Sequence, residues 1–344
     1  MTNLKGLATG IGSLPLTDAG IAVDLILRYL PALPFWPQLP KGNVGEGMLA
    51  QFSENLPGLK FEGGDLRFIA PDKEKELELF YDRLIAKDLE YFKISPDFAR
   101  GLHVFYDRLN CVDLSSIEFI KCQVTGPFTF CAGITDEQGK IILHDAVLMQ
   151  AMVKALGMKA LWQLEHFKKF GKKMIMFFDE PFLTGVGSAY TTVNRQEVID
   201  VYAELADTLK SQGSLIGIHC CGNTDWSMLT DTPGIDIINF DAFNFQERFV
   251  LYADNLNHFL KRGGIICWGI VPTNEFTAEL GPEGLAQKIK LGLDILVKKG
   301  VSRELLLERL LISPACGLGT LDVPKAEGIL NLLNQTSLFI RKNL

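Results

Sequence analysis

Short apolar runs alternate along the chain with longer amphipathic stretches. The short runs are rich in β-branched and aromatic residues and are apolar almost throughout, which is typical of strands buried on both faces of a sheet. They cover residues 6–12, 33–39, 117–125, 173–179, 214–220, 236–241, 264–270 and 310–313. Helical periodicity marks residues 147–170, 194–212, 286–299 and 323–340.

The alternation of eight such runs with helical stretches in 344 residues predicts an α/β fold, specifically a (β/α)8 TIM barrel. A doubly wound open sheet is the alternative, because alternation alone does not show closure. Residues 40–116 are long for one connection. They predict an elaborated β2–α2 region with helices at 73–87 and 95–109 and a hairpin around 62–65. No linker or repeat interrupts the chain, so we expect a single domain over residues 1–344.

Composition and charge disfavour several classes of protein. The net charge of −7 argues against nucleic-acid binding, because phosphate contacts need clustered Lys and Arg. No uncharged apolar run reaches the roughly 18 residues of a membrane helix, and the N-terminal residues lack the pattern of a secretion signal. The seven cysteines have irregular spacings, unlike a disulfide framework. We therefore expect a cytoplasmic protein with reduced thiols.

Polar and ligand-type residues follow nearly every predicted strand. In a barrel, functional residues collect at the carboxyl ends of the strands. The strand ends here read Gly10-Ile11-Gly12-Ser13, Thr125-Gly126-Pro127, Asp179-Glu180-Pro181, His219-Cys220-Cys221, Asp241 and Pro314-Ala315-Cys316-Gly317. This distribution indicates a site at that end of the fold, although the acidic pair before Pro181 could instead cap a helix.

The His-Cys-Cys triplet predicts half of a metal site. Side chains alternate faces along a strand, so His219 and Cys221 point the same way and Cys220 points the other way. Zinc takes four ligands from Cys, His and carboxylate groups, and Cys316 and Asp241 could complete the set if the barrel closes. The alternative is that these side chains only pack in the core, because buried cysteines are common and a core histidine is usually hydrogen-bonded. We assign a packing role to the remaining cysteines, Cys111, Cys122, Cys131 and Cys267.

Six motifs in order resemble the catalytic barrel of cobalamin-independent methionine synthase. They are GIGSLP, TGPFTF, FFDEPFL, HCC, INFDAF and ISPACGLGT, and they extend from about residue 7 to residue 320. That family shares a superfamily with uroporphyrinogen decarboxylase and the corrinoid-dependent thiol methyltransferases. Each motif is short, but six at successive strand ends make a specific signal.

The resemblance implies zinc-dependent methyl transfer to a thiol, with homocysteine as acceptor and methionine as product. It implies zinc ligands at His219, Cys221, Asp241 and Cys316. It also implies that the amino-acid substrate is held by Ile11, Gly12, Ser13, Glu46 and Asp179. It identifies no residue as a catalytic acid or base.

Several departures from the family bear on the methyl donor. Full-length members have two barrels, and this chain has room for one. Residues 128–132 lack the family's tryptophan-containing loop, and residues 268–272 contain no histidine where the family has one. Asp241 is one methylene shorter than the usual Glu. These departures favour a corrinoid protein over a folate as the methyl source.

Three alternatives remain open. The first is a corrinoid-dependent methyltransferase with another acceptor, such as a coenzyme M-like thiol. The second is a uroporphyrinogen decarboxylase-like protein. This match is poor, because the substrate of that enzyme has many carboxylates that call for Arg, and residues 34–42 contain Lys41 and no Arg. The third is a non-catalytic scaffold stabilised by zinc.

Overall fold

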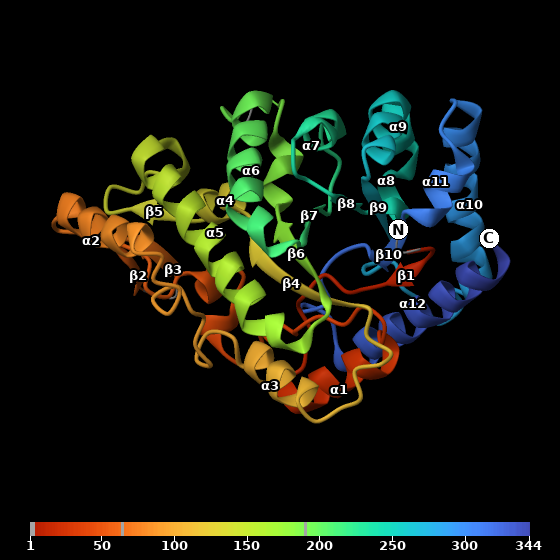
Figure 1. Cartoon of the computed structure of the whole chain (residues 1–344), viewed down its shortest axis with the longest axis horizontal. Helices are drawn as coiled ribbons and strands as arrows, with labels where there is room; N and C mark the ends of the chain where they lie inside the picture. Colours follow the sequence, from red (N-terminus) through yellow and green to blue (C-terminus); the bar gives the residue numbers. More distant parts are fainter. Residues whose placement is uncertain (1–3, 63–64, 189–190) are drawn as a thin grey trace.

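One curled, parallel sheet organises the fold (Figure 1). The computed structural model describes residues 4–62, 65–188 and 191–344. Seven strands follow the order β1-β10-β9-β8-β7-β6-β4, and every neighbouring pair is parallel. The strands are β1 (Leu7–Ala8), β4 (Phe119–Thr125), β6 (Lys173–Asp179), β7 (Leu215–Cys220), β8 (Ile237–Phe240), β9 (Ile265–Val271) and β10 (Leu310–Pro314). The α/β class and the parallel sheet are thus confirmed.

The strand predicted at residues 33–39 is not formed, so the hydrogen-bonded sheet is not a closed eight-stranded barrel. The segment reaches the chain after β1 through one bridge, Ser13–Gln38, and β4 through another, Phe35–Lys121. Pro34 and Pro37 interrupt it, and Pro40 follows it directly. Proline has no N–H to donate to a neighbouring strand, so a regular ladder cannot form here.

Helices cover the outer face of the sheet (Figure 1). The four predicted helices are confirmed with small shifts at their ends, and α6 begins with a capping box between Asn194 and Glu197. Within the described residues, no helix is long and apolar enough to cross a membrane. The helices are α1 (Ala19–Tyr29), α4 (Pro127–Ala132), α5 (Ala146–Phe167), α6 (Arg195–Leu209), α7 (Trp226–Asp231), α8 (Ala242–Phe249), α9 (Ala253–Lys261), α10 (Pro282–Lys298), α11 (Arg303–Glu308) and α12 (Val323–Asn343).

The long connection between residues 40 and 116 contains the elements that its pattern predicted. Helices α2 (Lys73–Ile85) and α3 (Arg100–Leu109) lie near the predicted positions. Strands β2 (Leu59–Glu62) and β3 (Asp65–Phe68) pair antiparallel, and β5 (Thr135–Asp136) extends this small sheet. Residues 63–64, at the centre of the predicted hairpin, lie outside the described residues. The single-domain organisation stays a prediction.

The concave side of the large sheet changes from apolar to polar along the strands. Near the amino ends, a small buried cluster includes Leu7, Phe119, Ile175, Ile237, Ile265 and Leu311. Two residues further along the strands, the buried side chains include Thr9, Lys121, Asn239 and Ser313. Because the strands are parallel, their carboxyl ends lie at one edge, and the polar side chains collect there.

We expect Gly101→Ala to destabilise the protein, because α3 packs directly on the proline-rich segment. A Cβ at Gly101 would lie 1.9 Å from the carbonyl oxygen of Pro37. Overpacking of this kind costs about 1–3 kcal/mol of unfolding free energy, measurable by urea denaturation. The control is Gly284→Ala in α10, where a Cβ would meet nothing within 4 Å. This substitution should stabilise the helix by up to about 1 kcal/mol, because alanine has the higher helix propensity. Equal stability of the two variants would refute this packing.

Candidate metal centre

Parallel pairing aligns the functional side chains of three neighbouring strands. Asp179 at the end of β6 pairs with His219 in β7, and His219 pairs with Asn239 in β8. Cys221 follows directly after β7. The alternation of side chains places His219 and Cys221 on the concave side, whereas Cys220 packs among the buried residues of the main core.

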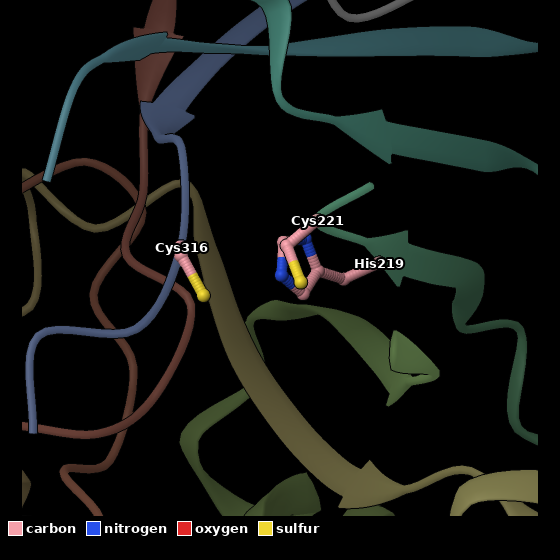
Figure 2. Close-up of side chains that lie close together, drawn as sticks. All are labelled: His219, Cys221 and Cys316. Carbon is pink, nitrogen blue, oxygen red and sulfur yellow. The ribbon is translucent and has the colours of Figure 1, made fainter. Parts of the chain in front are cut away.

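The structure brings three of the four predicted metal ligands together. The ligand atoms of His219, Cys221 and Cys316 all lie within 4.8 Å of one another. His219 is buried, and both cysteines are half-buried. Figure 2 shows the Cys316 sulfur pointing from the loop after β10 toward the imidazole and the Cys221 thiol. In the part of the chain that the structure describes, no other group of three or more His, Cys, Asp and Glu ligands is this close.

The three side chains also set one another's protonation. The hydrogen bond from the Cys221 thiol, reinforced by His219, lowers the pKa of Cys316 to about 4. The same Cys316 contact, together with burial, raises the pKa of Cys221. Burial opposes a charge on His219, but its hydrogen bond with Cys316 and the charge of Asp179 outweigh burial and raise its pKa. Cys316 is therefore the more acidic of the two thiols.

A cavity of about 490 Å³ opens onto this group. Its size suits a small-molecule ligand, since such pockets span about 300–1,000 Å³. Gly12 lies beside the wall, and a Cβ there would be 2.1 Å from Oε1 of Gln38, so a larger residue would displace the Gln38 side chain. The lining residues include the three candidate ligands and four predicted substrate residues, Ile11, Ser13, Glu46 and Asp179.

Asp179 offers the cavity an unused acceptor. Its side chain is only 6% exposed, and Oδ1 is buried with no hydrogen-bond partner among the described residues. Burial raises the pKa of Asp179, while the positive charges of Lys121 and His219 oppose that rise. A buried carboxylate oxygen without a partner costs free energy, and a bound cationic group would supply the missing hydrogen bond.

Glu46 lines the same cavity, but its carboxylate is already engaged. Oε2 accepts from the Leu39 amide at 3.1 Å, and Oε1 accepts from the Arg100 amide at 3.3 Å. Burial is the main reason that its pKa rises to about 7. Glu46 therefore ties the proline-rich segment to the start of α3, and it carries less negative charge at neutral pH than an ordinary glutamate.

The fourth predicted ligand, Asp241, lies outside the three-residue group. It caps α8, with Oδ1 accepting from the Asn244 amide at 2.9 Å and Oδ2 accepting from Nδ2 of Asn244 at 2.8 Å. Both oxygens thus have partners in the helix that Asp241 starts. Its role as a ligand stays a prediction.

Glu180 has the capping role that was the alternative for the acidic pair. Its carboxylate accepts from the amides of Phe128 and Thr129, at 3.0 and 2.8 Å, at the start of α4. The Tyr202 hydroxyl donates to it at 2.6 Å. Glu180 is fully buried, so it holds α4 in place while its neighbour Asp179 faces the cavity.

Sequence reasoning missed Lys121, which lies beneath the site. Its ammonium is buried and donates to the Ile11 carbonyl at 2.5 Å and to Oε1 of Gln123 at 3.1 Å. It also lies 5.0 Å from the centre of the Phe177 ring, and burial lowers its pKa to about 8. A charged residue within a run whose pattern predicts a buried strand was the available signal.

Comparisons with known proteins support the fold. No family model matches the chain, and no curated protein matches it. A solved structure from Listeria monocytogenes, provisionally named a vitamin-B12 independent methionine synthase, has 15% identity and a TM-score of 0.55, covering 94% of this chain and 86% of that chain. An E. coli 3-keto-D-glucoside 4-epimerase has 10% identity and a TM-score of 0.39, covering 71% of this chain and 85% of its own. At 15% identity, the likeness to the Listeria structure extends to the fold alone.

We expect Cys316 of the metal-free protein to be alkylated readily even in mild acid. Its pKa of about 4 keeps it a thiolate, and the thiolate fraction is lost only as the pH falls through that value. Burial raises the pKa of Cys122 and Cys131, so these thiols should remain unmodified. Iodoacetamide labelling at pH 5.5, read by peptide mass spectrometry, measures the difference. Labelling of Cys316 only at alkaline pH would contradict the arrangement.

Proposed function

We propose that this chain is an enzyme that transfers a methyl group to a thiol, with Zn²⁺ held by His219, Cys221 and Cys316. The observation that carries the proposal is the meeting of one imidazole and two thiols at the wall of a cavity sized for a small molecule. The resemblance of the strand-end motifs to the methionine synthase family favours homocysteine as the acceptor.

The donor set fits zinc. Zinc in proteins prefers nitrogen and sulfur ligands, and catalytic sites keep one position open beside three protein ligands. The three side chains supply such a set, and both sulfurs belong to half-buried residues that line the cavity. When bound, the ion would lower the pKa of an incoming thiol, so that the acceptor is present as its nucleophilic thiolate.

The residues around the centre would orient an amino-acid thiol. Asp179 would bind the ammonium group through its unpartnered oxygen. Ser13 is held in the wall because the Gly319 amide donates to its Oγ at 3.2 Å. Lys121 fixes the Ile11 carbonyl from below, so the Ile11–Ser13 turn is rigid before the substrate arrives. Such orientation lowers the entropic cost of reaching the reactive geometry.

A corrinoid protein is our proposed methyl donor, because residues 128–132 lack the tryptophan-containing loop of the methionine synthase family. One observation also favours a different acceptor. Lys41 lines the cavity, with its ammonium donating to the Leu321 carbonyl at 2.5 Å. A cation at this position would suit the sulfonate of a coenzyme M-like thiol as well as the carboxylate of homocysteine.

We expect the purified chain to contain one zinc ion per molecule and Cys316→Ser to lose it. A neutral serine hydroxyl is a poor zinc ligand compared with a thiolate. The matched control is Cys111→Ser, because Cys111 is exposed and lies outside the ligand group. Metal analysis of both variants is the measurement. Full zinc occupancy in Cys316→Ser would refute the ligand assignment.

The acceptor is tested by Asp179→Asn. Loss of a hydrogen bond to a charged group costs about 1.5–3 kcal/mol, so homocysteine should bind the zinc-loaded variant roughly ten- to a hundred-fold more weakly. Binding of 2-mercaptoethanesulfonate, which has no ammonium, should change little. Binding of either thiol is measured as a change in the absorbance spectrum of the cobalt-substituted protein. A spectrum that neither thiol perturbs in the parent protein would instead indicate a non-catalytic scaffold.

A further inference from the structure

A buried asparagine contacts the histidine of the centre from behind. Asn239 is the one polar residue of β8, whose sequence is IINF, and it is 1% exposed. It lies in register with His219 on one side and with Cys267 on the other. An amide is costly to bury unless its polar atoms have partners, so its hydrogen bonds indicate its role.

The bonds of Asn239 fix which way its amide faces. Nδ2 donates to the Cys267 carbonyl at 3.0 Å and to Oγ of Ser313 at 2.8 Å. A backbone carbonyl can only accept, so the NH₂ group must be on that side. Oγ of Ser313 in turn donates to the Pro314 carbonyl at 2.8 Å. With both amide hydrogens used, the remaining atom, Oδ1, must face His219.

This orientation determines where the imidazole carries a hydrogen. Oδ1 of Asn239 lies 2.5 Å from Nδ1 of His219. An amide oxygen only accepts, so Nδ1 must donate. The hydrogen bond of His219 with Cys316 then uses the other nitrogen, Nε2. In the neutral imidazole, Nε2 therefore has its lone pair directed toward the two sulfurs that Figure 2 shows beside the ring.

We propose that Asn239, supported by Ser313, is a positioning residue that fixes the tautomer and the ring orientation of His219 for metal binding. The relay joins His219 to the Pro314 carbonyl, two residues before Cys316, so one network sets ligands from two distant parts of the chain. The role in metal binding rests on the proposed zinc centre. A flipped ring or the other tautomer would leave Oδ1 of Asn239 without a donor.

The first test measures zinc affinity by competition with a chromophoric chelator. Loss of a residue that orients a metal ligand typically weakens binding about 10–100-fold, and we expect this for Asn239→Ala. The matched control is Gln246→Ala, which removes a buried amide that is bonded to the Lys288 carbonyl at 3.0 Å and is not bonded to any of the three candidate ligands. It should leave zinc affinity unchanged. Equal affinity of Asn239→Ala and the parent protein would overturn the proposal.

A milder variant covers the case in which Asn239→Ala does not fold. Ser313→Ala removes one acceptor of the Asn239 amide and leaves its bonds to Cys267 and His219. We expect a several-fold loss of zinc affinity, smaller than the loss for Asn239→Ala. Circular dichroism of the metal-free variants establishes folding. A folded Ser313→Ala that binds zinc as the parent does would remove Ser313 from the relay and count against the proposal.

The second test needs no metal. In a Cys221→Ala, Cys316→Ala background no thiolate competes for Nε2, and ¹⁵N NMR of labelled histidine at alkaline pH reports the neutral tautomer. We expect the Nδ1–H form for His219 and its loss in Asn239→Ala. An Nε2–H form in the background protein would overturn the relay, whatever the zinc result. If Nδ1–H is found but the parent protein binds no zinc, the proposed function fails and the relay stands.

Discussion

The parallel register of β6, β7 and β8 is the constraint on which the site depends. It places Asp179, His219 and Asn239 side by side at one level of the sheet. The alternation of side chains then directs His219 and Cys221 to the same face. A one-residue slip of β7 would turn His219 outward and replace it with Ile218 or Cys220. The apolar residues that fill the outer core, including Ile216, Ile218 and Cys220, make that slip costly because they would move into the polar interior.

Inside the curled sheet, the side chains that stabilise the fold lie near the amino ends of the strands, and those of the candidate site lie near the carboxyl ends. The apolar layer near the amino ends contributes burial, and in the next layer most polar groups form hydrogen bonds with one another and with the backbone, the Thr9 hydroxyl being an exception. Lys121 and Asn239 both follow this rule, with two hydrogen bonds to fixed acceptors each. Asp179 does not, because Oδ1 has no partner among the described residues. An unsatisfied buried group at a cavity wall is where a ligand would contribute most.

Much of the fold and part of the site could be predicted from the sequence. Periodicity located seven strands and the main helices, because strands buried on both faces have an unmistakable pattern. It failed at residues 33–39, where the apolar pattern is right but two prolines prevent the ladder. The alternation rule paired His219 with Cys221 correctly. It could not show that Asp241 would be used to start α8, because capping depends on local geometry after the strand ends.

The roles of Asn239 and Lys121 could not be predicted from the hydrophobic pattern of the sequence. Each is a polar residue in a buried strand, and its role can be assigned only once its partners are known. The partners of the Asn239 NH₂ group come from β9 and β10, more than 25 positions away in sequence. Glu46 shows that a residue type suited to a ligand can have a structural role instead. Its carboxylate could bind an ammonium group, but it is largely engaged by two backbone amides.

The central claim is that one ion binds His219, Cys221 and Cys316 and leaves one position for a thiol. X-ray absorption spectroscopy at the zinc edge of the purified chain measures this directly. The account predicts two sulfurs at about 2.3 Å and two lighter ligands at about 2.0–2.1 Å, with a third sulfur replacing a lighter ligand when homocysteine is added. A first shell without sulfur, or one that homocysteine leaves unchanged, would contradict it.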